Sequence, residues 1–170
     1  MPKAPPTRSH EGLVAGVLGA TAVALWFLIY DTLSGLPGRT PSVLGQAILL
    51  QEPNPIVDRV LFGPLLAYTV VHFAVFIVIG SVVVWLVTRA EHQRLFWSAL
   101  LVLLAVFEVF FAGFLQVWSS NTAGQFPIWT VLIANALALV VMLGYAFRGH
   151  PRVVRLLARE VREGEYVEER

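Results

Sequence analysis

The sequence contains no cysteine and has few charged residues. Among 170 residues, Asp, Glu, Lys and Arg together make up 14%, where soluble domains carry about 25%. The absence of Cys excludes disulfides, thiolate-bound metals, iron–sulfur clusters and covalently attached c-type haem. The formal net charge of +1 leaves no basic surface of the size that nucleic-acid binding requires, so no nucleic-acid partner is expected.

Hydrophobic residues dominate the sequence instead. They make up 57% of the chain, and the mean hydropathy is +0.73. A water-soluble fold of this size has too little interior to bury so much apolar surface. The composition therefore excludes a soluble enzyme and indicates an integral membrane protein.

Four apolar runs are long enough to cross a bilayer, which takes about 20 residues. None shows the period-2 alternation of membrane β-strands. We therefore predict an all-α, polytopic membrane protein in which residues 1–147 form a bundle of four transmembrane helices. The predicted spans cover about residues 13–30, 61–87, 95–118 and 127–147.

Lys and Arg are distributed unequally between the two ends of these spans. If the N-terminus is inside, ten of the 12 fall on the inner side, and only Arg39 and Arg59 fall on the outer side. The positive-inside rule then predicts that both termini are cytoplasmic. Tryptophans, which favour membrane interfaces, lie near the same boundaries: Trp26, Trp118 and Trp129 outside, Trp85 and Trp97 inside.

The longest segment between spans, Asp31 to about Val60, is expected on the outer side. It begins with Gly and Pro residues that are typical of a turn. Thr40 is expected to cap a short helix over about residues 41–51, with Pro41 at its first position. The apolar residues of this helix share one face, which suits a helix in the outer interface or packed against the bundle.

The C-terminal segment, residues 148–170, is expected to be cytoplasmic. Its first part predicts an amphipathic helix whose apolar face is flanked by Arg152, Arg155, Arg159 and Arg162. Such a helix beside a span typically rests on anionic lipid headgroups or docks on another subunit. A solvated helical extension is the alternative, but it would leave the apolar face in water.

Small residues recur every four positions in the first span, at Gly12, Gly16, Ala20 and Ala24. In this register they let another helix approach closely, so we expect a helix-packing face there. The partner helix belongs either to this chain or to another.

Residues 11–45 combine this small-residue helix with Trp26-Phe27, Asp31, a Gly/Pro turn and Thr40-Pro41. Over this segment, about a fifth of the chain, the sequence resembles a family of small, uncharacterised four-span bacterial integral membrane proteins. The resemblance implies a bacterial inner membrane. It brings no activity and no site residues.

The four predicted spans contain two acidic or basic residues, His72 and Glu108. They lie about 25 Å and about 21 Å from the inner ends of their helices, at 1.5 Å per residue. An unpaired charge at that depth costs several kcal/mol, so we expect the two side chains to be energetically coupled. Thr21 and Asn135 fall near the same depth, which makes a polar centre of these four residues possible.

Three roles for this polar centre remain open. It forms interhelical hydrogen bonds, or it binds a metal, haem or quinone, or it relays protons or lines a solute path. Structural hydrogen bonding is favoured, and no metal site is predicted because a stable cage takes three or more ligands. The cofactor remains unknown.

No nucleophile, metal-binding or nucleotide-binding motif is present, so no enzyme is expected. The leading hypothesis is a non-catalytic membrane subunit or scaffold in a larger inner-membrane complex or homo-oligomer, with the lipid bilayer as its surroundings. The alternative is a small carrier, or a cofactor-, quinone- or metal-binding protein, that uses His72 and Glu108.

Overall fold

The computed structural model describes residues 8–90 and 127–150, and the regular elements in these two ranges are all helical. The long helices are α1 (Arg8–Leu33), α3 (Phe62–Ala90) and α5 (Ile128–Gly149). Two short helices, α2 (Arg39–Leu44) and the π-helix η1 (Gly45–Leu49), lie between α1 and α3 in the sequence.

Within residues 8–90 and 127–150, three helices are long and apolar enough to cross a membrane. They are the stretches His10–Leu33, Phe62–Arg89 and Trp129–Gly149. This result confirms the all-helical prediction for the described residues and agrees with several membrane spans in length and composition. The predicted third span, about residues 95–118, and the tail beyond residue 150 lie outside the described residues.

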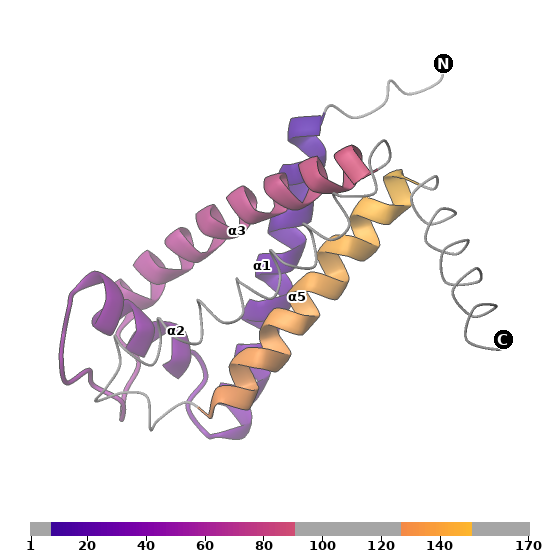
Figure 1. Cartoon of the computed structure of the whole chain (residues 1–170). Helices are drawn as coiled ribbons and strands as arrows, with labels where there is room; N and C mark the ends of the chain where they lie inside the picture. The colour runs from indigo at the N-terminus through magenta and orange to yellow at the C-terminus, as the bar shows by residue number, and fades with distance from the viewer. Residues whose placement is uncertain (1–7, 91–126, 151–170) are drawn as a thin grey trace, which may run out of the picture.

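Helix α1 is central among the described helices. It packs along both α3 and α5, which contact each other much less (Figure 1). Near the C-terminal end of α1, the indole Nε1 of Trp26 donates a hydrogen bond of 2.9 Å to the carbonyl oxygen of Thr130. At the other end, Glu11 lies 3.6 Å from Nε2 of His150. Helices α1 and α5 are therefore antiparallel.

Helices α1 and α3 cross with their backbones in close contact. A Cβ atom added to Gly12 would lie 2.7 Å from Cα of Ser81. A Cβ on Gly80 would lie 2.6 Å from Cα of Gly16, and one on Gly16 would lie 2.5 Å from Cα of Ile77. Real Cβ atoms do not approach so closely, so this crossing requires glycine on both helices.

The interior between the long helices is apolar. One cluster of buried residues contains Ala15, Val83, Val84, Leu86, Val87 and Ala146. A second contains Ala20, Val23, Phe76, Ala134, Ala138 and Met142. Small alanines from α1 and α5 in both clusters allow these helices to pack closely, where dispersion supplies the attraction.

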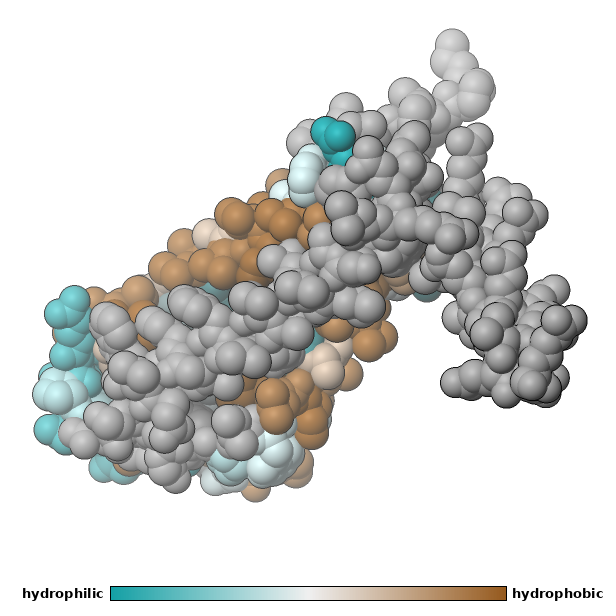
Figure 2. Space-filling model, viewed as in Figure 1, coloured by the Kyte–Doolittle hydropathy of each residue, from teal (hydrophilic) through white to brown (hydrophobic). Residues whose placement is uncertain are grey.

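Large apolar side chains are also exposed on the outside of the bundle. Val70 on α3 is 70% exposed and Val140 on α5 is 68% exposed. Figure 2 shows the described surface as hydrophobic along the length of the helices and hydrophilic at the two ends. A continuous apolar surface of this kind suits contact with hydrocarbon.

The short helix after α1 differs from its prediction. Helix α2 begins at Arg39, with Gly38 as its N-cap at φ 83° and without a side-chain cap from that residue. Thr40 and Pro41 are therefore the second and third residues of the helix, and the expected Thr40 cap is wrong. The physical reason is that Asp31, at the end of α1, supplies the oxygen that accepts the amide hydrogen of Thr40.

Two polar side chains hold the segment between η1 and α3 in place through hydrogen bonds. The amide of Gln46 donates to the carbonyl oxygen of Ile56 at 3.1 Å, and its oxygen accepts the N–H of Ile56 at 2.9 Å. The hydroxyl of Ser42 accepts the N–H of Leu61 at 2.9 Å. Helix α2 and η1 pack against α3, so this part of the chain is folded onto the bundle.

Candidate functional site

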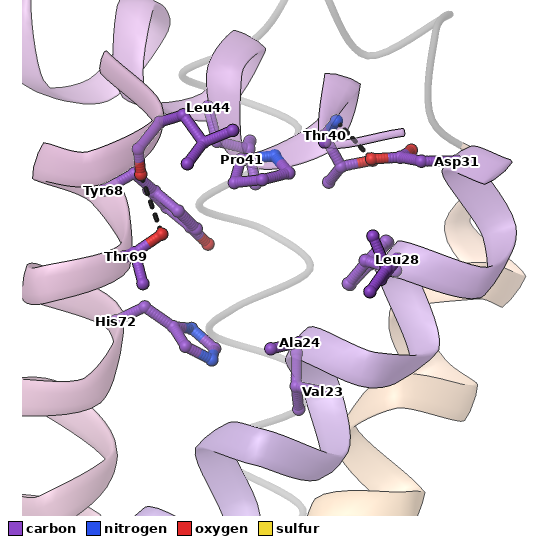
Figure 3. A pocket seen from close by; sticks show the side chains of 13 residues that line it. Val23, Ala24, Leu28, Asp31, Thr40, Pro41, Leu44, Tyr68, Thr69 and His72 are labelled. Atoms are coloured by element: carbon purple, nitrogen blue, oxygen red, sulfur yellow. Dashed lines mark hydrogen bonds between the residues drawn. The ribbon is translucent and has the colours of Figure 1, made fainter. Parts of the chain in front are cut away.

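A cavity of about 220 Å³ lies between α1, α2 and the N-terminal half of α3. Figure 3 shows the side chains around it, including His72 and Tyr68 from α3, Ala24 and Leu28 from α1, and Pro41 from α2. Its lining residues are Val23, Ala24, Phe27, Leu28, Asp31, Gly38, Thr40, Pro41, Leu44, Leu65, Tyr68, Thr69 and His72. Most of them are apolar, so the cavity favours uncharged molecules.

His72 projects from α3 toward α1 at this cavity (Figure 3). Its Nε2 lies 3.2 Å from the carbonyl oxygen of Ala20. A carbonyl oxygen can only accept, so Nε2 carries the hydrogen. In the neutral ring Nδ1 is then a hydrogen-bond acceptor, and within the described part of the chain no donor lies against it.

Aromatic rings surround the imidazole of His72. The ring of Tyr68 stacks on it at 25°, with the centroids 5.9 Å apart. Phe76 lies 4.6 Å away at 47°, and Phe73 meets it edge-on at 5.9 Å. These three rings hold the orientation of the imidazole and exclude water from it on these sides.

The side chains of Asp31, Thr40 and Thr69, which also line the cavity, form hydrogen bonds within the protein. The carboxylate of Asp31, which is 1% exposed, accepts hydrogen bonds from the amide and the hydroxyl of Thr40 at 2.7 and 2.6 Å. The hydroxyl of Thr69 donates to the carbonyl oxygen of Leu65 at 2.8 Å. His72 thus presents to the cavity a ring nitrogen that can accept a hydrogen bond from a bound molecule.

Of the described members of the predicted polar centre, His72 lines the cavity, whereas Thr21 and Asn135 do not. Thr21 is exposed, and its hydroxyl donates to the carbonyl oxygen of Val17 in its own helix at 2.8 Å. Asn135 is buried on α5, which contributes no residue to the cavity lining. Helix α1 instead meets His72 through the backbone of Ala20. Glu108 lies outside the described residues, so its coupling to His72 stays a prediction.

The four small residues of α1 have different surroundings. Gly12 and Gly16 lie against α3, which makes α3 of the same chain their partner helix. Ala20 is fully buried, whereas Ala24 is exposed at the wall of the cavity. The tail arginines, Arg152, Arg155, Arg159 and Arg162, lie outside the described residues.

Metal-binding groups are not clustered in the described part of the chain. Among residues 8–90 and 127–150, no three His, Asp or Glu side chains lie close enough to hold a metal ion.

Sequence reasoning did not select Asp31 as a site residue. One signal for it was present: α1 has no basic residue in its last turn, and an acidic side chain there opposes the helix dipole. Such a residue needs a specific partner. That partner, Thr40, follows nine residues later across a turn.

No protein-family model, curated protein or solved structure matches the chain. A functional assignment therefore depends on the helices, the cavity and the hydrogen bonds described above.

Proposed function

We propose that the chain is a non-catalytic subunit or scaffold of a bacterial inner-membrane complex, formed either with other proteins or with further copies of itself. The observation that supports this role is that polar side chains of the bundle form hydrogen bonds between its elements. Trp26, Gln46 and His72 each bond to a backbone atom of another element or segment. Bonds of this kind fix the relative positions of helices, which is what a scaffold requires.

The proposed topology has α1, α3 and α5 as spans, with a fourth span at about residues 95–118 and both termini in the cytoplasm. It is supported by the distribution of basic residues over the described helices. Arg89 ends α3 and Arg148 lies in the last turn of α5, at the end of the bundle where α1 begins. Arg39 and Arg59 lie at the opposite end, in the segment between α1 and α3. The positive-inside rule therefore favours a cytoplasmic location for the first end.

The bacterial inner membrane is proposed from the resemblance over residues 11–45 to small four-span bacterial membrane proteins. For the segment 148–170 we propose docking on anionic lipid or on a partner subunit through its basic amphipathic helix. Both proposals are compatible with a bundle whose outer surface is apolar and whose ends are polar (Figure 2).

Gentle purification tests the subunit role. The full chain with an affinity tag is extracted into lipid nanodiscs, its mass is measured by light scattering, and co-purifying proteins are quantified by mass spectrometry. We expect a particle of several chains at a fixed ratio and no absorption between 350 and 700 nm beyond that of the lipid. A single chain of 18.8 kDa without stoichiometric partners would contradict the proposal.

A matched variant that lacks residues 151–170 makes this test sharper. It keeps the described helices intact, so loss of the partners from this variant alone would assign docking to the tail. Retention of all partners would assign it to the bundle.

A second candidate function is favoured by one observation, the cavity beside His72. A small carrier or ligand-binding membrane protein would use such a cavity to hold an uncharged molecule within the bilayer. The two functions are compatible because a subunit can also bind a ligand.

A further inference from the structure

We propose that the cavity beside His72 binds a monocyclic phenol or hydroquinone ring that enters from the bilayer, with the ring hydroxyl donating a hydrogen bond to Nδ1 of His72. This inference rests on the second candidate function and gives its ligand a chemical class. The ligand is therefore a neutral, mostly apolar molecule with a hydroxyl donor on an aromatic ring.

The size of the cavity fits one ring. Its volume is about 220 Å³, whereas an engineered apolar cavity of about 150 Å³ binds benzene. The additional space accommodates a hydroxyl and one or two small substituents. A fused polycyclic ring system would not fit without movement of α1 or α3.

The walls of the cavity favour an aromatic ring over a flexible chain. Phe27, Leu28 and Leu65 supply apolar surface, and Tyr68 contributes an aromatic face next to the imidazole. Aromatic rings attract one another in stacked and edge-to-face arrangements beyond the gain from burial alone. A rigid ring also loses less conformational freedom on binding than an alkyl chain does.

The direction of the hydrogen bond follows from the bond that His72 already makes. Because Nε2 donates to the carbonyl oxygen of Ala20, a neutral His72 presents an acceptor to any second partner. A hydroxyl satisfies this acceptor, whereas a hydrocarbon leaves it unpaired in an apolar cavity, which is unfavourable. The site therefore selects a phenol over an alkylbenzene or a lipid acyl chain.

Fluorine NMR of two matched probes tests this proposal with the full chain in nanodiscs. The probes are 4-fluorophenol, which has a hydroxyl donor, and 4-fluoroanisole, in which a methyl group replaces the donor hydrogen. Empty nanodiscs correct for partition into lipid. We expect saturable binding of the phenol, with the anisole bound about 10-fold more weakly, equivalent to about 1.4 kcal/mol, because it lacks the donated hydrogen bond.

Two variants of the lining and one control locate the binding. His72→Phe keeps an aromatic ring and removes the acceptor, so it should weaken phenol binding about 10-fold and leave the anisole unchanged. Ala24→Leu fills the cavity from α1 and should abolish binding of both probes. Val70→Leu is the control, because Val70 lies on α3 but is 70% exposed and outside the lining.

Each result decides the proposal. Equal binding of phenol and anisole, or a phenol affinity that survives both His72→Phe and Ala24→Leu, would overturn it. Cyclohexanol binding as tightly as the phenol would show a general alcohol site and would overturn the aromatic part. Failure here leaves the subunit role untouched, since that role depends on the partners found by purification.

Discussion

The carboxylate of Asp31 accepts two hydrogen bonds from Thr40, one from the backbone N–H at 2.7 Å and one from the hydroxyl at 2.6 Å. Asp31 stands in the last turn of α1 and Thr40 in the first turn of α2. The first amide groups of a helix have no acceptor within that helix. Asp31, a residue of α1, therefore caps α2 and fixes the turn between the two helices.

Removal of this cap is expected to destabilise the bundle. Asp31→Leu leaves the amide and hydroxyl of Thr40 without their acceptor, which should lower the free energy of unfolding by about 1–3 kcal/mol. Asp31→Asn keeps one acceptor oxygen and should lose less. Unfolding of the purified chain in mixed micelles with increasing SDS, followed by circular dichroism, measures the difference.

Thr32→Val is the matched control for this series. It removes an exposed hydroxyl whose hydrogen bond returns to Leu28 within α1. Equal stability of Asp31→Leu and Thr32→Val would show that the cap contributes nothing. In the double variant Asp31→Leu with Thr40→Val, the total loss should be smaller than the sum of the two single losses.

The three long helices could be predicted from the sequence because their lengths are set by a physical dimension. A bilayer requires about 20 apolar residues per helix, and uninterrupted apolar runs of that length are visible without any tertiary information. The predicted start at residue 61 and the observed start of α3 at Phe62 differ by one residue. Pro64 fits in the first turn of α3 because the backbone N–H that proline lacks would have no acceptor within the helix at that position.

The cap on α2 and the cavity could not be predicted in the same way. Their geometry depends on the path of a short turn, in which Gly35 and Gly38 adopt φ values of 85° and 83°. The sequence shows that such residues permit a turn, but it does not show which side chain the turn brings to Thr40. The contact of His72 with Ala20 likewise depends on how α1 and α3 cross, which is determined by glycine contacts between residues far apart in the sequence.

The glycine crossing leads to a second prediction. Gly16→Leu inserts a side chain where even a Cβ would lie 2.5 Å from Cα of Ile77, so it should force α1 and α3 apart. Overpacking of this kind costs about 1–3 kcal/mol or more. The SDS midpoint of the chain should fall, and any partner bound to the bundle should be released.

Gly144→Leu provides the control for added bulk. Gly144 lies on α5, is exposed, and has no neighbouring atom within 4 Å of an added Cβ. It should leave the SDS midpoint unchanged or slightly raised, because leucine has the higher helix propensity. If Gly16→Leu were as stable as Gly144→Leu, the close contact between α1 and α3 would be refuted.

The coupling of His72 to Glu108 gives a third prediction. Glu108→Gln keeps shape and hydrogen bonding and should preserve the fold, whereas Glu108→Leu should destabilise it. The addition of His72→Leu to Glu108→Leu should recover part of the loss, because it removes the imidazole that Glu108 no longer stabilises. Strict additivity of the two changes in the SDS assay would show that the residues are independent.

The claim that α1 crosses the membrane, with the segment between α1 and α3 outside, is tested most directly by cysteine labelling. The chain has no natural Cys, so single cysteines replace exposed His10, exposed Asn54 and buried Ser42 in turn. Spheroplasts are treated with a membrane-impermeant maleimide before and after lysis. We expect Asn54→Cys to react before lysis, His10→Cys only after it, and Ser42→Cys in neither case. Labelling of His10→Cys before lysis to the same extent as Asn54→Cys would contradict the topology.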